Sequence, residues 1–340
     1  MKAAIFRGAR DIRVEEYPYP QLPDDGVIIK VNSSGICGSD LHVYSRGGRG
    51  GGDGMIMGHE FSGDVVEIGK DVENVKVGDR VVAIGGIGCG ECYWCQQGLY
   101  IKCSKLSFLG YGIKGAFAEY TAIPNFKIGM YAEKLPDSVS YEEGATAEPL
   151  SVALYAVNQV QPKPDDICVV TGLGIIGICV IQILRARGVK TIIASGRRSK
   201  RLEIAKQSGA EVVSDAAKED IVPVVEKVTG SRKADVVFEV AGVPELFEKS
   251  LQMVHRGGKI NLVGLYMEPV TWNPSFIVSN DLTIIGCGLR WDLPGAVELL
   301  ASGKVDTKPM ITHEFPLDQT KEAFETQLTS QDAIKVIVKP

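Results

Sequence analysis

The sequence has little excess charge of either sign and few cysteines for its length. Its 37 lysines and arginines against 42 aspartates and glutamates leave a net charge of −5. A chain organised around the phosphates of a nucleic acid carries a clear basic excess, so we expect no nucleic acid partner. Eight cysteines in 340 residues are also too few for the disulfide scaffold of small secreted proteins. Their spacing is therefore more informative than their number.

Targeting signals and long apolar runs are also scarce. The N-terminus carries Arg7, Arg10 and Asp11 and has no apolar stretch long enough for a signal peptide. One run of 18 uncharged residues, 167–184, reaches the lower limit for a membrane-spanning helix. Three glycines and a glutamine interrupt this run, so a strand, a tight turn and a helix explain it better. We therefore expect no membrane contact and a cytoplasmic protein with reduced thiols.

Length and composition indicate a folded protein of more than one domain. The 340 residues are about twice the ~150 typical of one domain, and 45% are hydrophobic against 23% charged. Residues 1–150 contain many short runs rich in Val and Ile, of which 26–31, 64–68 and 80–83 are examples. Turn-forming residues separate these runs, so we expect a barrel-like β domain with long loops.

From about residue 165 the pattern changes to strands that alternate with helices. The expected strands are residues 167–171, 191–194, 235–240, 260–264 and 282–285. One expected helix ends at Arg187 with Gly188 as its C-terminal cap, a second spans 199–208 with Ser199 as N-cap, and a third spans 244–256. This alternation predicts βαβ units around a parallel sheet, the α/β class.

A glycine-rich turn follows the first of these strands and opens a helix. It fits G-x-G-x-x-G with Gly172, Leu173, Gly174, Ile175, Ile176 and Gly177. The first glycine permits the tight turn, the second lets the backbone approach a pyrophosphate, and the third lets the helix pack on the strand. Because the motif stands between a strand and a helix, it indicates dinucleotide binding rather than an ordinary glycine-rich loop.

The end of the next strand indicates which dinucleotide. An NAD site usually places Asp or Glu there, to bind the ribose 2′-hydroxyl. Residues 194–199 include Arg197 and Arg198 but no carboxylate. Arginine suits a 2′-phosphate because its planar guanidinium makes charge-assisted hydrogen bonds, although a solvated basic loop would also contain arginines. We expect NADP(H), with NAD(H) as the alternative.

Four cysteines are spaced C-x2-C-x2-C-x7-C: Cys89, Cys92, Cys95 and Cys103. Four thiolates this close suit a closed tetrahedral zinc site. An iron–sulfur cluster is the main rival, but the ferredoxin pattern continues with x3 and Cys-Pro, whereas here the gap is seven and Ser104 follows. A nucleic-acid-binding zinc finger lacks an evident recognition helix. We expect structural zinc.

A second set of candidate ligands is scattered along the chain. It comprises Cys37, Ser39, Asp40, His42, His59, Glu60 and Glu148. Each residue alone has an ordinary structural explanation. Together they offer the sulfur, nitrogen and oxygen donors that suit zinc with an exchangeable position. The remaining cysteines, Cys168, Cys179 and Cys287, lie in apolar runs and are expected in the core.

The combined motifs resemble the zinc-dependent medium-chain dehydrogenases of the alcohol and polyol dehydrogenase family. The resemblance covers essentially the whole chain through residues 37–42, 58–60, the four cysteines, 148–150, the glycine-rich turn and 312–317. Residues 148–151 and 288–291 are closest to the sorbitol and 2,3-butanediol dehydrogenase branch.

The resemblance implies a GroES-like β-barrel catalytic domain and a Rossmann nucleotide-binding domain with a doubly wound parallel sheet. Residues 1–149 would form the catalytic domain, with a structural-zinc lobe at 86–105. Residues 150–286 would form the Rossmann domain, and 287–340 would complete the catalytic domain. The resemblance also favours a homotetramer over a dimer.

The resemblance also implies individual roles. Cys37 and His59 would bind a catalytic zinc, with Glu60 and Glu148 binding it directly or through its water and Asp40 orienting His59. Ser39 and His42 match the family's proton relay. The cofactor would contact the glycine-rich turn, Ser195, Gly196, Arg197, Arg198, Leu265 and Arg290. His255 and His313 match no catalytic position. Each chain would hold two zinc ions.

The activity that follows is hydride transfer between a secondary alcohol and NADP(H), with a vicinal diol, polyol or sugar as substrate.

Two features depart from the polyol branch: the acidic residue of the second strand is missing, and Val43 and Trp291 stand where an aromatic residue and a tyrosine are usual. An L-threonine 3-dehydrogenase-like or simple secondary alcohol dehydrogenase is the alternative. An NADPH-binding sensor that has lost activity is the non-enzyme alternative.

Overall fold

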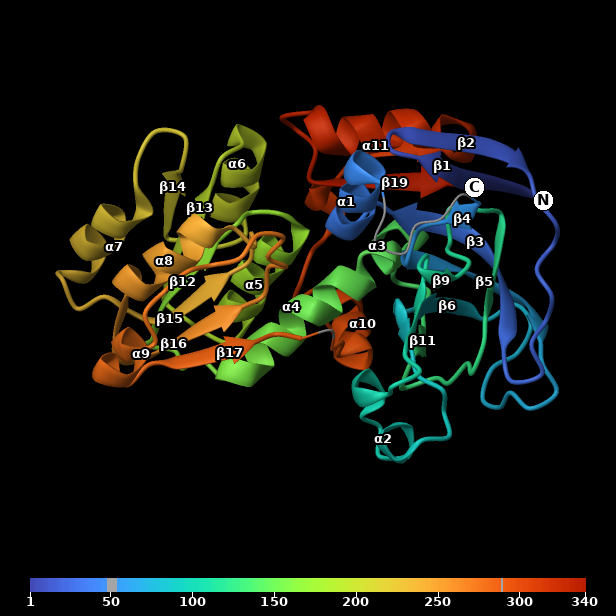
Figure 1. Cartoon of the computed structure of the whole chain (residues 1–340), viewed down its shortest axis with the longest axis horizontal. Helices are drawn as coiled ribbons and strands as arrows, with labels where there is room; N and C mark the ends of the chain where they lie inside the picture. Colours follow the sequence, from blue (N-terminus) through green and yellow to red (C-terminus); the bar gives the residue numbers. More distant parts are fainter. Residues whose placement is uncertain (48–53, 289) are drawn as a thin grey trace. The chain divides into compact units, whose positions relative to one another are not determined.

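The structure is a computed structural model that describes residues 1–47, 54–288 and 290–340. The chain divides into two compact units (Figure 1). The first unit contains residues 1–151, 291–303 and 307–340. The second contains residues 152–290 and 304–306 and therefore interrupts the first along the chain.

The first unit is built on a mixed sheet with the strand order β11-β6-β5-β3-β19-β18, in which β10 also pairs with β3. Two three-stranded sheets, β2-β1-β4 and β7-β8-β9, belong to the same unit. The strands are β1 (Lys2–Gly8), β2 (Asp11–Glu16), β3 (Val27–Gly35), β4 (Met55–Ile56), β5 (Glu60–Ile68), β6 (Arg80–Ala83), β7 (Gly86–Ile87), β8 (Ser107–Leu109), β9 (Gly112–Ile113), β10 (Tyr120–Ile123), β11 (Ala132–Lys134), β18 (Ile311–Pro316) and β19 (Lys335–Lys339).

Short helices connect these strands. They are α1 (Gly38–Arg46), α2 (Tyr93–Gln96), α3 (Tyr141–Ala145), α10 (Leu293–Ala301), α11 (Thr320–Thr329) and the 3-10 turns Tyr100–Lys102, Lys308–Met310 and Leu317–Gln319. Helix α4 (Ala147–Val160) begins in the first unit and ends in the second. The C-terminal strand β19 pairs with β3, near the start of the chain, so residues about 300 apart in sequence share one sheet (Figure 1).

The second unit contains an all-parallel sheet with the order β14-β13-β12-β15-β16-β17. Its strands are β12 (Ile167–Thr171), β13 (Thr191–Gly196), β14 (Val212–Asp215), β15 (Ala234–Glu239), β16 (Val254–Leu262) and β17 (Thr283–Gly286). Its helices are α5 (Ile175–Ala186), α6 (Ser199–Gln207), α7 (Ile221–Thr229), α8 (Pro244–Met253) and α9 (Ser275–Asn280). The strand order reverses between β12 and β15, which is the switch point where doubly wound folds bind ligands.

The apolar runs of this unit are buried as the pattern predicts. All five residues of β12 are buried, which explains why this strand reads as a continuous apolar run with the expected bounds. Helix α5 ends one residue before Arg187, and Gly188 beyond it has a φ of +83°, the left-handed conformation of a C-terminal cap.

Two expectations of local structure were wrong. The helix expected over 244–256 ends at Met253, because the next residues pair with β15, beginning with Val254 opposite Ala234. Pairing with a buried strand outweighs the weak helix preference of this stretch. Ser199 is the first helical residue of α6 rather than its N-cap, which is Arg198.

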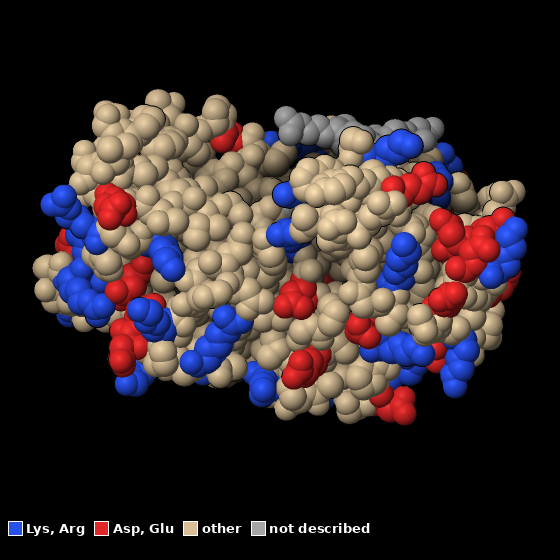
Figure 2. Space-filling view, turned by 90° about the horizontal axis from the view of Figure 1, so that it is seen from below, with Lys and Arg blue, Asp and Glu red and all other residues tan. Residues whose placement is uncertain are grey.

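The surface agrees with the small net charge. On the face seen in Figure 2, acidic and basic side chains are interspersed, and neither sign covers a broad continuous area. Across the described part of the chain, the helices are all too short or too polar to cross a bilayer.

Candidate active site

Cys37, His59 and Glu60 come together in the first unit, where strands β3 and β5 pair. Gly35 ends β3 and lies opposite Glu60, which begins β5. Cys37 lies two residues beyond the end of β3 and is the N-cap of α1. One ligand atom from each of the three lies within 4.8 Å of the others. Residues that the sequence leaves scattered therefore converge, and their thiol, imidazole and carboxylate fit a zinc ion.

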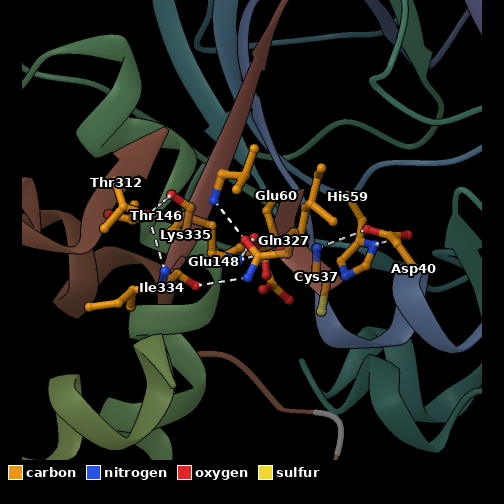
Figure 3. A network of polar contacts seen from close by, with 12 residues as sticks. Cys37, Asp40, His59, Glu60, Thr146, Glu148, Thr312, Gln327, Ile334 and Lys335 are labelled. Carbon is orange, nitrogen blue, oxygen red and sulfur yellow. Dashed lines mark hydrogen bonds and ion pairs between the residues drawn. The ribbon is translucent and has the colours of Figure 1, made fainter. Parts of the chain in front are cut away.

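His59 is turned toward a buried carboxylate. Its Nδ1 lies 3.7 Å from Asp40 Oδ1 and has no hydrogen-bond partner, and Figure 3 shows its other ring nitrogen on the side of Cys37. Burial lowers the pKa of His59, but the charges of Asp40 and Cys37 outweigh it and raise this pKa well above its usual value. This is how metal-binding histidines are commonly held, with one nitrogen facing a carboxylate and the other free for the metal.

Glu60 is paired with a lysine that the sequence did not single out. Lys335 on β19 forms a buried ion pair with Glu60 Oε2 and donates a hydrogen bond of 2.8 Å to the carbonyl oxygen of Ile36 (Figure 3). Burial lowers the pKa of Lys335, yet the attraction of Glu60 and Cys37 raises it overall. In the sequence Lys335 is one of two lysines that bracket the apolar residues of β19, a position that more often lies at the surface.

Glu148 lies in the first turn of α4 and is buried. The indole N–H of Trp291 donates to its Oε1, so the residue that departs from the polyol branch contacts a predicted ligand. Burial, partly offset by His59, raises the pKa of Glu148 to about 7. Its carboxylate is not part of the 4.8 Å group formed by Cys37, His59 and Glu60. Direct ligation by Glu148 therefore requires a movement of its side chain.

The two residues of the expected proton relay lie on α1. Ser39 and His42 are three residues apart and so share one side of the helix. Ser39 is half-buried, whereas His42 is exposed. Partial desolvation of its ring and the neighbouring Arg46 lower the pKa of His42 below its usual value, which favours the neutral imidazole that can accept a proton.

The four closely spaced cysteines form a second cluster. One sulfur from each of Cys89, Cys92, Cys95 and Cys103 lies within 4.8 Å of the others. None of the eight cysteines, all of which lie in the described residues, forms a disulfide bond. Backbone N–H groups of Cys89 and Lys105 point at the Cys103 sulfur, at 3.5 and 3.3 Å. Four converging sulfurs with N–H support are what a closed zinc site requires. Cys168, Cys179 and Cys287 are buried elsewhere, as expected.

The glycine-rich turn of the second unit has the geometry that its motif demands. Gly172 has a φ of +99°, and a Cβ atom there would lie 2.8 Å from the Ala241 nitrogen. A Cβ atom on Gly177 would lie 1.9 Å from the Gly172 oxygen, so the helix can approach the strand only without a side chain. Gly174, the N-cap of α5, has open space around its Cβ position. This open space is where a pyrophosphate would approach.

Several of the other predicted cofactor residues lie at the end of the neighbouring strand β13. Ser195 and Gly196 end β13, and Arg198 caps α6. Burial and the charge of Arg198 lower the pKa of Arg201 to about 10. Leu265 is exposed, and Leu289 lies outside the described residues. Arg290 donates to the hydroxyl of Tyr155 at 3.1 Å.

Sequence reasoning missed Glu239 at the end of β15. Its buried carboxylate accepts hydrogen bonds from the backbone of Ala241 and Gly242 and from the Tyr266 hydroxyl. These bonds hold the loop that packs against Gly172. Glu239 therefore supports the loop beside the predicted cofactor site.

Comparison with known proteins gives a consistent picture. The family model described as "Alcohol dehydrogenase GroES-like domain" matches residues 23–133, and that described as "Zinc-binding dehydrogenase" matches residues 176–302. Sorbitol dehydrogenase of Bacillus subtilis is 36% identical over 100% of this chain and 97% of its own length. (R,R)-butanediol dehydrogenase of the same organism is 35% identical over 100% of both chains.

Solved structures agree in fold. A putative zinc-binding dehydrogenase from Sinorhizobium meliloti bound to NADP has a TM-score of 0.90, with 29% identity over 100% of this chain and 99% of the other. An alcohol dehydrogenase from Escherichia coli complexed with NADH has a TM-score of 0.91, with 28% identity over the same shares. The expected combination of a GroES-like and a Rossmann-type domain is confirmed. The chain belongs to the zinc-dependent medium-chain alcohol and polyol dehydrogenase family.

Proposed function

We propose that the protein oxidises a secondary alcohol that carries further hydroxyl groups, such as a vicinal diol, a polyol or a sugar, with NADP⁺. The convergence of Cys37, His59 and Glu60 within 4.8 Å carries this proposal. In it, Cys37 and His59 hold a catalytic zinc. Glu60 and Glu148 bind that ion directly or through its water.

A bound zinc ion would supply a Lewis acid that lowers the pKa of the substrate hydroxyl, and a nicotinamide would supply the hydride acceptor. The chain's own residues handle the proton. The Ser39 hydroxyl accepts it from the substrate and passes its own proton on toward His42, which is exposed and releases a proton to solvent. His42 can do so because its lowered pKa favours the neutral imidazole.

The cofactor and the second metal follow from the other two clusters. The second unit acts as the nucleotide-binding domain, with the pyrophosphate at Gly174 and the 2′-phosphate at Arg197 and Arg198. The first unit acts as the catalytic domain. Its four-cysteine cluster holds a structural zinc, which gives two zinc ions per chain. By analogy with the family, the protein is cytoplasmic and forms a homotetramer. Light scattering, which measures the mass of the assembly, tests the tetramer.

The choice of a hydroxylated substrate rests on the carboxylates of the site. Glu60 and Glu148 are both buried, and each offers oxygen acceptors that suit neighbouring hydroxyls. Lys335 binds Glu60 Oε2 and Trp291 binds Glu148 Oε1, so a second substrate hydroxyl would bind the other oxygen of either carboxylate. A simple alcohol cannot make this additional hydrogen bond.

A substrate panel run with both cofactors tests the proposal. It contains 2,3-butanediol, sorbitol and other polyols, a simple secondary alcohol, and L-threonine. We expect kcat/KM for a diol or polyol with NADP⁺ to exceed that for the simple alcohol, and that with NAD⁺, by at least about tenfold, the effect of 1.4 kcal/mol. A preference for L-threonine or for the simple alcohol would contradict the substrate class. Equal use of NAD⁺ would contradict the cofactor.

A further inference from the structure

Tyr111 lies beside the candidate zinc site although none of the motifs contains it. It stands between β8 and β9, eight residues after Cys103. Its hydroxyl donates a hydrogen bond of 3.1 Å to Asp40 Oδ1. Its ring lies 6.2 Å from the His59 ring, centroid to centroid. The phenol thus contacts the carboxylate that lies behind a proposed zinc ligand.

The backbone fixes Tyr111 in this place. Gly110 and Gly112 on either side have positive φ values of +83° and +128°. A Cβ atom on Gly110 would lie 3.2 Å from the backbone nitrogen of Gly58, the residue before His59. The turn that carries Tyr111 is therefore packed directly on the segment that carries His59, which leaves the phenol little freedom.

Asp40 depends on this contact because it is fully buried. Its Oδ2 accepts from the backbone nitrogen of Cys37 at 3.0 Å. Its Oδ1 accepts from Tyr111 and faces His59 Nδ1 at 3.7 Å. Without the phenol, Oδ1 would keep only the imidazole as a neighbour, and the carboxylate could rotate about its bond. A buried carboxylate with few donors is poorly held, so the orientation of His59 would loosen with it.

We propose that Tyr111 is a positioning residue that holds Asp40 behind His59. This inference rests on the proposed function, because it assigns His59 to zinc. The competing explanation is that the phenol only anchors the turn at residues 110–112. The two explanations differ in their predictions for removal of the hydroxyl: a positioning role affects zinc retention and kcat, whereas an anchoring role affects thermal stability alone.

The first test is Tyr111→Phe, compared with Tyr141→Phe. Tyr141 also donates from a half-buried phenol to a carboxylate, Asp64 Oδ1 at 2.5 Å, but it contacts no proposed ligand or relay residue. Zinc loss to a chelator is followed in both variants, and the phase that is missing in Cys37→Ser is assigned to the catalytic site. We expect catalytic zinc to leave about tenfold faster in Tyr111→Phe, the lower end of the effect of outer-shell changes, and at the wild-type rate in Tyr141→Phe.

Steady-state kinetics and the spectrum of the cobalt-substituted protein should also distinguish the two variants. In Tyr111→Phe we expect kcat to fall about tenfold with little change in KM, and the cobalt-substituted protein to show a shifted visible spectrum. Tyr141→Phe should match the wild type in both. Equal zinc loss, equal kcat and equal spectra in the two variants would overturn the inference, since an anchor for the turn would change thermal stability alone.

A double-mutant cycle tests whether Tyr111 acts through Asp40. In an Asp40→Asn background, Tyr111→Phe should accelerate zinc loss by less than about twofold, because the carboxylate it holds is already gone. A full tenfold effect in that background would overturn the inference. A wild-type protein that binds no zinc would overturn the proposed function as well. If the wild type is active and zinc-loaded but Tyr111→Phe leaves zinc loss and kcat unchanged, only the inference about Tyr111 is overturned.

Discussion

The Lys335 ammonium and the Glu60 carboxylate form an ion pair inside the first unit, with side chains 3% and 2% exposed. Lys335 comes from the last strand of the chain and Glu60 from β5, and both strands flank β3 in the sheet. A buried charge is stable only with a partner, so each member keeps the other in place when no metal is bound. The carboxylate of Glu60 therefore has a counter-charge besides any zinc ion.

Removal of Lys335 should destabilise the metal-free protein strongly. Lys335→Met leaves Glu60 as an unpaired buried carboxylate, which we expect to lower the free energy of unfolding in urea by about 3–5 kcal/mol. Zinc should restore part of this loss, because a cation then faces Glu60. The matched control is Lys339→Met on the same strand, whose pairs with Glu142 and Glu314 are partly exposed and should be worth about 1 kcal/mol or less. Losses of equal size in the two variants would refute this account.

The four-cysteine cluster should contain one reactive thiolate once its metal is removed. Backbone N–H groups of Glu91 and Cys92 lower the pKa of Cys89 to about 6, whereas burial raises the pKa of Cys95 to about 12. Since the thiolate is the nucleophile, alkylation of Cys89 should rise as the pH passes 6 and level off above 7. Peptide mapping after iodoacetamide treatment measures this, with the zinc-loaded protein as the unreactive control. Preferential labelling of Cys95 at pH 7 is the outcome that speaks against the cluster as described.

Alanine substitutions at two glycines of the nucleotide turn should affect different properties, stability in one case and NADPH binding in the other. Gly177→Ala places a Cβ atom 1.9 Å from the Gly172 oxygen, so we expect a loss of about 1–3 kcal/mol in stability. Gly174→Ala meets nothing within 4 Å and should keep the wild-type melting temperature, yet it should weaken NADPH binding where the pyrophosphate approaches. Thermal unfolding and NADPH titration of both variants separate the effects. Unchanged NADPH affinity in Gly174→Ala would move the cofactor away from this turn.

Cofactor preference should depend on Arg197 and Arg198. Changing both to Ala removes the guanidinium groups proposed to bind the 2′-phosphate, and charge-assisted hydrogen bonds contribute about 1.5–3 kcal/mol each. We expect KM for NADP⁺ to rise more than tenfold and KM for NAD⁺ to stay nearly constant. Steady-state kinetics with both cofactors provide the measurement. Equal increases would show that these arginines do not recognise the phosphate.

Much of the parallel-sheet unit could be predicted from sequence because its signals are local. The bounds of β12 follow from an uninterrupted apolar run between a charged segment and Gly172. The end of α8 could not be predicted, because Val254 becomes extended only through its pairing with Ala234. Local patterns do not contain that long-range pairing.

The same distinction applies to the site. Cys37, His59 and Glu60 could be proposed because each stands in a short recognisable motif. Lys335 and Tyr111 could not, because their roles arise from contacts across 275 and 71 residues of chain. A lysine in β19 and a tyrosine between two glycines carry no signal in the sequence. Only the folded chain places them against Glu60 and Asp40.

Zinc content measured together with turnover in Cys37→Ser tests the central claim most directly. The wild type should contain two zinc ions per chain. The variant should retain one, in the four-cysteine cluster, should bind NADPH with wild-type affinity and should lose turnover, because the thiolate that holds the catalytic ion is gone. A Cys37→Ser protein that keeps two zinc ions and a normal kcat would contradict the assignment of Cys37, His59 and Glu60 as the catalytic metal site.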